Sequence, residues 1–393
     1  MTLLEPEVEA RPWKQQLALD DIAYRSQLAY LLERSPFYRE KLASAGITEA
    51  GQADGLAEIS RLPLTEKQEL RDSVTAANPF GAHLCADREQ IVRIYSTSGT
   101  TGAPSYIPLT VSDLDNWVTG SARSYAGSGI AAGERIVSTY NAGPFVAGAA
   151  LASFDRIGLS HIPVGTGNSE RLMLAIQLLQ PEAAVLTPSY AAYLIEWAAD
   201  RGIDLAAESV RRVLVAGEPG GGEPAFRELL ERGWGARVTE AMGIGDLGVS
   251  LWGECERQDG MHLGARGFVH PELIDPETGA SIAMDNGANG ELVLTHLAHQ
   301  AAPLLRFRTR DHVSVRTGAC PCGRTGPRVR CIGRTDDMLI VRGVNVFPSA
   351  VREVVSAFEP AVSGNIRQAA GGGREAGSAA SGRRRAGRGT RCR

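Results

Sequence analysis

A run of hydroxyl side chains and glycines lies at residues 95–104, which read Tyr-Ser-Thr-Ser-Gly-Thr-Thr-Gly-Ala-Pro. Glycine lets a backbone come close to an anion, and hydroxyls and free amides donate hydrogen bonds to phosphate oxygens. No Gly-Lys-Ser/Thr follows, so this is not a Walker-type loop. We predict that a strand over residues 91–95 leads into a phosphate-binding loop; a polar hairpin turn is the alternative. The predicted phosphate contacts are Ser96, Thr97, Ser98, Gly99, Thr100, Thr101 and Gly102.

The cysteines suggest a metal. Cys255 precedes His262 by seven residues, and Cys320 and Cys322 bracket a proline. Three thiolates and one imidazole form a closed tetrahedral set for structural Zn²⁺. The alternative is that these are ordinary small buried side chains.

Four more segments follow the hydroxyl loop in a fixed order: residues 216–219 (Ala-Gly-Glu-Pro), 242–246 (Met-Gly-Ile-Gly-Asp), 306–311 (Arg-Phe-Arg-Thr-Arg-Asp) and 333–337 (Gly-Arg-Thr-Asp-Asp). With the loop, they resemble the adenylate-forming superfamily, which activates a carboxylate with ATP. Residues 188–190, 252–255 and 341–348 resemble its phenylacetate–coenzyme A ligase branch. The resemblance covers about residues 35–364, and members of the branch with the same cysteines and histidine bind zinc there.

The resemblance implies a site for ATP and Mg²⁺. Asp311 would accept hydrogen bonds from the ribose hydroxyls, for which a carboxylate is well suited; a salt bridge to a neighbour such as Arg310 is the alternative. Asp246 would ligate Mg²⁺. The other implied nucleotide contacts are Gly217, Glu218 and Pro219, which wall the adenine, Met242, which faces it, and Arg334 near the domain junction. Asp246 and Arg334 are the predicted catalytic residues, and Asp336 is the predicted hinge.

Several positions depart from the family pattern. Ala103 replaces the loop lysine, Met242 replaces the aromatic residue that stacks on adenine, and Asp246 replaces a glutamate. No lysine follows Lys67, and family-like sequence stops near Gly364. These departures predict a C-terminus curtailed by truncation or a shifted reading frame, with weak adenylation and weak thioester formation. A natural disordered tail on a shortened enzyme is the alternative.

The implied acyl pocket contains Tyr140, Phe145, Gly148 and Ile244, although an apolar stripe of this kind is also ordinary core. The resemblance implies that an aromatic or arylacetic acid reacts with ATP to give an acyl-adenylate, which coenzyme A then converts to a thioester. The alternatives are an acyl-adenylate former with a different acceptor, and a nucleotide- and zinc-binding remnant without turnover.

The periodicity of apolar residues predicts an α/β fold of layered sheets and helices. A helix is expected over residues 14–46, and a second should open at Thr65 with Gln68 completing a capping box. Strands and helices alternate from residue 91, and β-type runs dominate after Gly235. The expected strands are 135–139, 161–164, 183–187, 212–215, 267–274, 291–295 and 304–308, and the expected helices are 168–179, 190–199 and 224–232. The predicted domains are 1–333 for adenylation, 334–370 as a partial C-terminal lobe and 371–393 as a disordered tail.

Charge is distributed unevenly along the 393 residues. The tail 371–393 holds seven arginines and one glutamate, so that, from the whole chain's −4, residues 1–370 sum to −10. An acidic body argues against a nucleic-acid partner. Four charged residues in the first eleven exclude a secretory signal, and no apolar run reaches a membrane span. We therefore expect a cytoplasmic enzyme whose partners are small molecules, and a homodimer is a further prediction.

Overall fold

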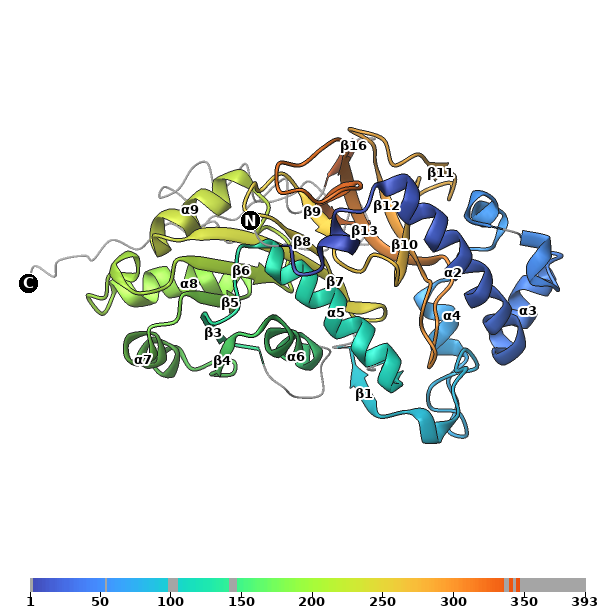
Figure 1. Ribbon diagram of the computed structural model, residues 1–393, viewed down its shortest axis with the longest axis horizontal. Coiled ribbons are helices and arrows are strands. Elements are labelled where there is room, and N and C mark those ends of the chain that lie inside the picture. The colour runs from blue at the N-terminus through green and yellow to red at the C-terminus, as the bar shows by residue number, and fades with distance from the viewer. Residues whose placement is uncertain are drawn as a thin grey trace, which may run out of the picture.

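The computed structural model describes residues 3–53, 55–97, 105–140, 147–335 and, as backbone, 339–341 and 344–346. Its largest feature is one 12-stranded sheet in the order β11-β10-β12-β13-β14-β9-β8-β7-β6-β5-β3-β4. Figure 1 shows α2, α3 and α4 at one end of the molecule, beside β10 and β12, and α7 and α8 at the other. The predicted α/β class is confirmed.

One half of the sheet is parallel and alternates with helices. Its strands are β3 (Arg135–Ser138), β4 (Ser160–Pro163), β5 (Ala183–Leu186), β6 (Arg212–Ala216) and β7 (Arg237–Ile244). Its helices are α6 (Ala147–Ile157), α7 (Ser169–Leu179), α8 (Pro188–Ala199) and α9 (Pro224–Trp234). Successive residues of β5 face opposite cores: Ala183 packs with α6, and Ala184 packs with α7, α8 and α9. A strand that is covered on both faces is apolar along almost its whole length, which is why β5 and β6 could be predicted from the sequence.

The other half is antiparallel. Its strands are β8 (Gly248–Glu254), β9 (Met261–Leu263), β10 (Val269–Ile274), β11 (Ser281–Ile282), β12 (Asn289–His296), β13 (Phe307–Arg316) and β14 (Arg328–Arg334). Two small antiparallel sheets pair β1 (Arg93–Ser96) with β2 (Tyr106–Leu109) and β15 (Leu339–Val341) with β16 (Val344–Val346).

The remaining described helices are α1 (Pro6–Glu9), α2 (Trp13–Arg34), α3 (Pro36–Ser44), α4 (Lys67–Asp72) and α5 (Val111–Gly127). Short 3₁₀ turns cover Ala50–Ala53, Leu56–Arg61, Arg88–Gln90 and Leu205–Ala207. The N-terminal helices pack onto the antiparallel half: the Gln27 amide donates to the His299 carbonyl at 3.0 Å and accepts from the His299 N–H at 2.9 Å.

Two predicted helix boundaries were wrong. The helix expected over 14–46 is broken at Pro36, because Ser35 is extended and its hydroxyl caps α3 by accepting from the Tyr38 N–H at 3.2 Å. Proline has no N–H to continue the preceding helix. The second helix begins at Lys67, with Glu66 and not Thr65 as its cap. Thr65 instead forms a β-bridge with Phe307, the first residue of β13. Its N–H donates to the carbonyl of the preceding residue, Arg306, at 2.8 Å.

Three strands also begin later than expected. The strand predicted from residue 91 begins at Arg93. The strand predicted from residue 267 begins at Val269, since Gly267 has a φ of +80°. The strand predicted from residue 304 begins at Phe307, after Arg306 at a φ of +46°. The described sheet ends at Arg334, so the boundaries at 333/334 and 370/371 stay predictions, and the predicted tail lies outside the described residues.

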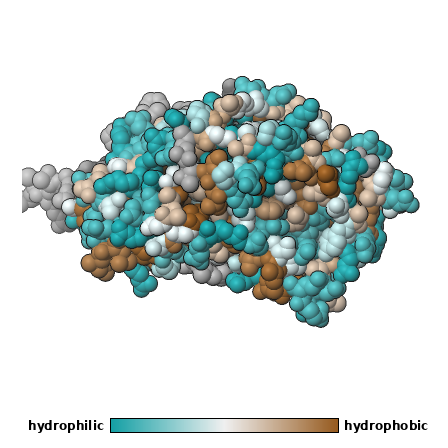
Figure 2. All heavy atoms as spheres, viewed as in Figure 1, coloured by the Kyte–Doolittle hydropathy of each residue, from teal (hydrophilic) through white to brown (hydrophobic). Residues whose placement is uncertain are grey.

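Exposed apolar side chains gather in two places. Leu174, Leu178 and Leu179 lie on α7, and Val92, Ile94, Tyr106 and Val111 lie on and beside the β1–β2 hairpin. Figure 2 shows hydrophobic spheres at the lower left, over α7, and below β1. Within the described ranges, no helix combines the length and the hydrophobicity that a membrane crossing requires.

Candidate functional site

Predicted nucleotide residues lie at strand ends in the middle of the sheet. β6 ends at Ala216 and leads directly into Gly217, Glu218 and Pro219. The neighbouring strand β7 carries Met242, and Ala216 pairs with Ala241 immediately before it. The sheet therefore brings the predicted adenine wall next to the residue predicted to face the base. The wall is also braced from α8, because the Ser189 N–H donates to the Glu218 carboxylate at 3.2 Å.

Asp311 and Arg334 are register partners on β13 and β14. The Arg334 guanidinium lies 3.4 Å from the Asp311 carboxylate. The alternative partner, Arg310, is used elsewhere, since it forms an ion pair with Glu66 at 2.6 Å. Two residues predicted separately as nucleotide contacts therefore form an ion pair with each other, and the salt-bridge alternative for Asp311 stays open with Arg334 as the partner.

Asp246, the predicted Mg²⁺ ligand, lies in the turn between β7 and β8. Its carboxylate accepts from the Lys67 ammonium, at the start of α4, at 2.7 Å. Burial lowers the pKa of nearby His83 to about 4, and the Asp246 charge opposes that shift. Lys67 was missed in the sequence reasoning, which considered only its neighbours as helix caps. The available signal was that Lys67 is one of three lysines in the chain.

The hydroxyl loop follows a strand as predicted. Ser96 ends β1 and is buried, and the Thr97 N–H donates to the Ser105 carbonyl at 3.0 Å. β1 and β2 pair antiparallel around the loop, with Ser96 opposite Tyr106. A hairpin and a phosphate loop are thus compatible here. The remaining predicted contacts, Ser98, Gly99, Thr100, Thr101 and Gly102, lie outside the described residues, as do Ala103 and Asp336.

The predicted acyl-pocket residues are only partly described. Tyr140 is half-buried and follows β3, Gly148 lies in the first turn of α6, and Ile244 is buried at the end of β7. Burial raises the pKa of Tyr140 well above its usual range. Phe145 lies outside the described residues.

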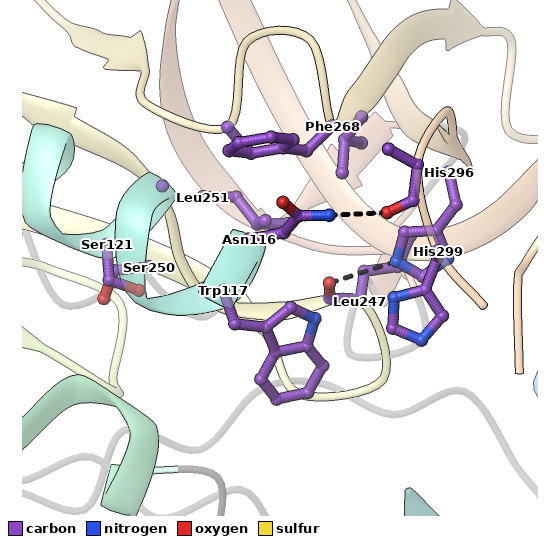
Figure 3. Close-up of a pocket in the computed structure, with 13 residues that line it drawn as sticks. Asn116, Trp117, Ser121, Leu247, Ser250, Leu251, Phe268, His296 and His299 are labelled. Carbon is purple, nitrogen blue, oxygen red and sulfur yellow. Dashed lines mark hydrogen bonds between the residues drawn. The ribbon is translucent and has the colours of Figure 1, made fainter. Parts of the chain in front are cut away.

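A cavity between α5, β8 and the segment 296–299 was not predicted (Figure 3). It is lined mainly by apolar side chains, including Trp117, Leu247 and Phe268. The three acyl-pocket residues that the structure describes are not among its lining residues. His296 and His299 stack at its edge with ring centroids 4.2 Å apart. Burial lowers the pKa of both imidazoles, so they are neutral core residues at physiological pH.

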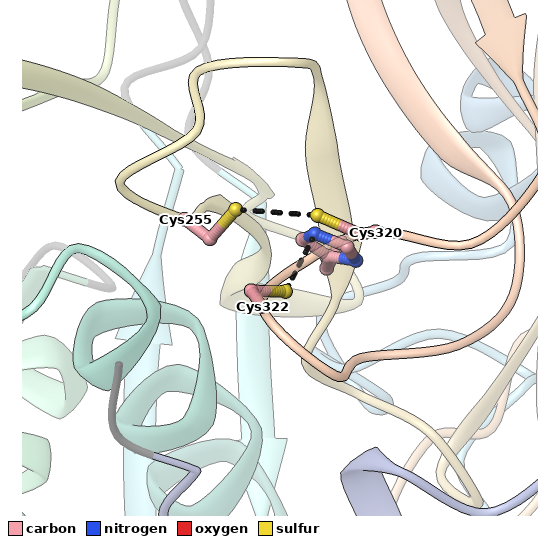
Figure 4. A group of neighbouring side chains, drawn as sticks. Cys255, Cys320 and Cys322 are labelled. Atoms are coloured by element: carbon pink, nitrogen blue, oxygen red, sulfur yellow. Dashed lines mark hydrogen bonds between the residues drawn. The ribbon is translucent and has the colours of Figure 1, made fainter.

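The four predicted zinc ligands are brought together and all are buried. Cys255 follows β8, His262 lies on β9, and Cys320 and Cys322 lie in the loop before β14. Their candidate ligand atoms all lie within 4.8 Å of one another. The Cys255 and Cys320 sulfurs are 3.7 Å apart, and the Cys322 sulfur is 3.5 Å from His262 Nε2. Figure 4 shows the three thiols turned toward one another.

The register of the sheet builds this cluster. His262 is the register partner of Gly253 on β8 and of Arg328 on β14, so β9 places its imidazole between the two cysteine-bearing segments. A hydrogen bond from the Cys255 thiol lowers the pKa of Cys322. Three sulfurs with one imidazole nitrogen match the donors that tetrahedral zinc takes.

The N-terminus is tied to the same loop. The Glu9 carboxylate accepts from Arg324 Nε at 2.7 Å, and both side chains are buried. The Arg324 N–H in turn contacts the Cys322 sulfur at 3.4 Å. Arg266 reinforces this connection by donating to the Glu9 carbonyl at 2.7 Å. The loop that carries two of the cluster cysteines is thus held by α1.

Known proteins resemble the chain along most of its length, although no protein-family model matches it. It is 36% identical over 364 residues to a phenylacetate–coenzyme A ligase of Thermus thermophilus, covering 92% of this chain and 79% of that enzyme. It is 34% identical over 362 residues to the enzyme of the same name from Escherichia coli, covering 91% and 80%.

Solved structures agree with these relatives. A 2-hydroxyisobutyryl-CoA ligase in the postadenylation state, in complex with R3-HIB-AMP, has a TM-score of 0.84 and 27% identity over 93% of this chain and 78% of that one. An open conformation of 2-hydroxyisobutyryl-CoA ligase with 2-HIB-AMP and CoA has a TM-score of 0.81 and 27% identity over 92% and 84%. The chain therefore belongs to the phenylacetate–coenzyme A ligase branch of the adenylate-forming superfamily.

Proposed function

We propose that the chain activates an aromatic or arylacetic acid with ATP and transfers the acyl group to coenzyme A. A carboxylate oxygen of the acid attacks the α-phosphorus of ATP, and pyrophosphate leaves. The thiolate sulfur of coenzyme A then attacks the acyl carbon of the adenylate, and AMP leaves. Family membership supports this reaction.

The observation that carries the proposal for this site is the Asp311–Arg334 pair on β13 and β14. The pairing of β13 with β14 places Asp311 opposite Arg334, and both side chains are partly exposed to solvent. A carboxylate in that position accepts hydrogen bonds from a ribose diol. Arg334 is then released to a phosphate oxygen, for which its guanidinium is well suited.

Positive charge at the reacting centre is the second requirement, because the attacking carboxylate and the phosphates repel each other. Asp246 offers a hard oxygen ligand for Mg²⁺. The Lys67 ammonium lies beside this Mg²⁺ ligand, because it forms an ion pair with Asp246. We propose that Lys67 turns from Asp246 to a phosphate oxygen when Mg²⁺ binds, and so supplies part of the charge that Ala103 does not.

We propose a structural zinc ion at Cys255, His262, Cys320 and Cys322. The support is the donor set and its burial. When bound, zinc would hold the two cysteine-bearing segments against β9, away from the reacting groups. The proposed compartment is the cytoplasm, where ATP and coenzyme A are both supplied; a homodimer and the absence of a nucleic-acid partner stay predictions.

Pyrophosphate exchange tests the proposal. The chain with phenylacetate and Mg²⁺ should incorporate labelled pyrophosphate into ATP, and adding coenzyme A should yield AMP and a thioester seen by mass spectrometry. Exchange without thioester formation would indicate a different acceptor. Nucleotide binding without exchange for any of a panel of aryl and arylacetic acids would indicate a remnant without turnover.

A further inference from the structure

Residues 217–222, in the loop that joins β6 to α9, are rich in glycine. Four of these six residues are glycine. Glycine loses more conformational freedom on ordering than any other residue, so such a loop needs external support to keep one shape. The proposed adenine wall occupies its first half, and its shape therefore bears on nucleotide affinity.

A buried side chain of α9 holds the second half of this loop. Arg227 Nε donates to the Gly221 carbonyl at 3.0 Å. The same guanidinium donates through Nη2 to the Glu254 carboxylate on β8 at 2.6 Å. That carboxylate oxygen also accepts from the Glu240 N–H of β7 at 3.1 Å. One helix and two strands are thus joined directly beneath the loop.

Glu240 completes the support. Its buried carboxyl lies against the backbone of Gly222, whose N–H favours the ionised form and so lowers the pKa of that carboxyl, against the larger effect of burial. A Cβ added at Gly222 would lie 2.5 Å from Glu240 Oε2, and one added at Gly221 would lie 2.4 Å from a methyl carbon of Val215. Only glycine allows the loop to rest so closely on the side chains of β6 and β7.

We propose that Glu240, Glu254 and Arg227 form a platform that positions loop 217–222 for adenine recognition. This inference rests on the proposed function, and assigns three positioning residues to it. None of the three touches the nucleotide; they act through the backbone of Gly221 and Gly222. Their removal should weaken the binding of AMP and ATP without changing the affinity for the carboxylic acid.

The charges of the platform give it a pH dependence. Burial, together with the Glu254 charge, raises the pKa of Glu240 to about 8. The other groups that face Glu240 are Arg227 on α9 and Arg330 and Cys331 on β14. Glu240 is therefore protonated at pH 7 and ionises as the pH rises through about 8. A second buried negative charge beneath the loop should then weaken AMP binding above that pH.

The test compares three variants by AMP titration calorimetry between pH 7 and 9. Glu240→Leu removes the carboxyl against which the Gly222 backbone rests and should raise the AMP Kd about tenfold. Glu240→Gln keeps an acceptor and cannot ionise, so its Kd should stay within about twofold of the wild type at pH 7 and stay flat to pH 9. Glu272→Gln is the matched control, because Glu272 is also a buried carboxyl paired with an arginine, Arg306 at 3.0 Å.

The results distinguish a failure of the platform from a failure of the proposed function. The platform is supported if Glu240→Leu raises the AMP Kd but leaves the KM for the acid unchanged, and if Glu272→Gln leaves the AMP Kd unchanged. Equal AMP affinity in Glu240→Leu and wild type, or an equal loss in Glu272→Gln, overturns it. If Glu240→Leu does not fold, a wild-type pH profile that matches that of Glu240→Gln overturns it. Wild-type protein that binds no AMP overturns the proposed function instead.

Discussion

The cysteine–histidine cluster lies at β8, β9 and the loop before β14, and the proposed nucleotide site lies at the ends of β6 and β7 and on β13 and β14. The two are built in opposite ways. In the cluster, four chemically active side chains face one another in a buried space. At the nucleotide site, Asp311 and Asp246 each face a cation of this chain, Arg334 and Lys67. A site that stabilises a fold can be assembled before its ligand arrives. A site that turns over must hold its charges in pairs that a substrate can replace.

Solvent exposure decides how much stability is lost when one partner of an ion pair is removed or replaced. The Arg334 and Asp311 side chains are 41% and 13% exposed, whereas those of Arg324 and Glu9 beside the cluster are 5% and 3% exposed. A hydrated pair contributes about 0–1 kcal/mol and is easily exchanged for a ligand. Removing one partner of a buried pair costs about 3–5 kcal/mol, because the other charge stays buried. The predictions below test this division.

The largest effect is expected for Cys322→Ser. Since metal binding contributes to folding free energy, the variant should lose bound zinc and melt about 10 °C or more below the wild type. Metal content by mass spectrometry and melting by circular dichroism measure the two losses. Cys331→Ser is the control and should keep both. Zinc-free wild-type protein that is as stable as zinc-loaded protein would remove the structural role.

Glu9→Gln should be the next most damaging change. It leaves the Arg324 guanidinium without its carboxylate partner in a buried place, at an expected cost of about 3–5 kcal/mol in urea unfolding. Glu58→Gln is the matched control, because its pair with Arg61 at 2.5 Å is exposed. That change should cost less than about 1 kcal/mol. Equal losses would show that exposure does not set the difference.

Asp311→Asn should act on nucleotide and not on stability. It removes the charged acceptor for the ribose diol, so the rise in melting temperature caused by AMP and Mg²⁺ should mostly disappear. Without nucleotide, the melting temperature should change by only a few degrees, since the pair with Arg334 is partly hydrated. Asp285→Asn, at an exposed acid, should keep the full shift. Nucleotide protection that survives Asp311→Asn would place the ribose elsewhere.

Lys67→Met should give the smallest change in stability, below about 1 kcal/mol. Its effect on catalysis should be larger: about tenfold to a hundredfold slower pyrophosphate exchange, because one preorganised charge is lost. Lys67→Arg should recover part of the rate, and Lys14→Met, at an exposed lysine, should have none of the effect. An unchanged exchange rate in Lys67→Met would mean that its bond to Asp246 serves the fold alone.

The sequence predicted best the parts of the fold whose pattern is local. β5 and β6 are continuous apolar runs between amphipathic helices, so their positions could be read directly. The four cluster residues were identified because cysteine and histidine have few alternative roles. The helix break at Pro36 was also local, and was missed because the apolar spacing continues across it.

Pairs distant in sequence could not be predicted in this way. Nothing near Lys67 indicates that it meets Asp246, and nothing near Glu9 indicates Arg324. Threonine is a common helix cap, but Thr65 forms a β-bridge with Phe307, and Glu66 caps the helix instead. Tertiary pairing decides such positions, and one sequence without its relatives does not reveal them.

The packing of α2 has a consequence for how the protein is made. Gln27 and Tyr30 hydrogen-bond to the carbonyls of His299 and Gln300, which lie 272 and 270 residues later in the chain. At a synthesis rate of about 5–20 residues per second, the helix leaves the ribosome roughly 15–50 s before these partners exist. During that interval the apolar residues of the helix can already pack against α3 and the residues that follow it, such as Leu42 and Ile59, but not against Leu297 and Leu305. We therefore expect the N-terminal helices to collapse early as a unit and to dock on the antiparallel half only when its last strands have been made.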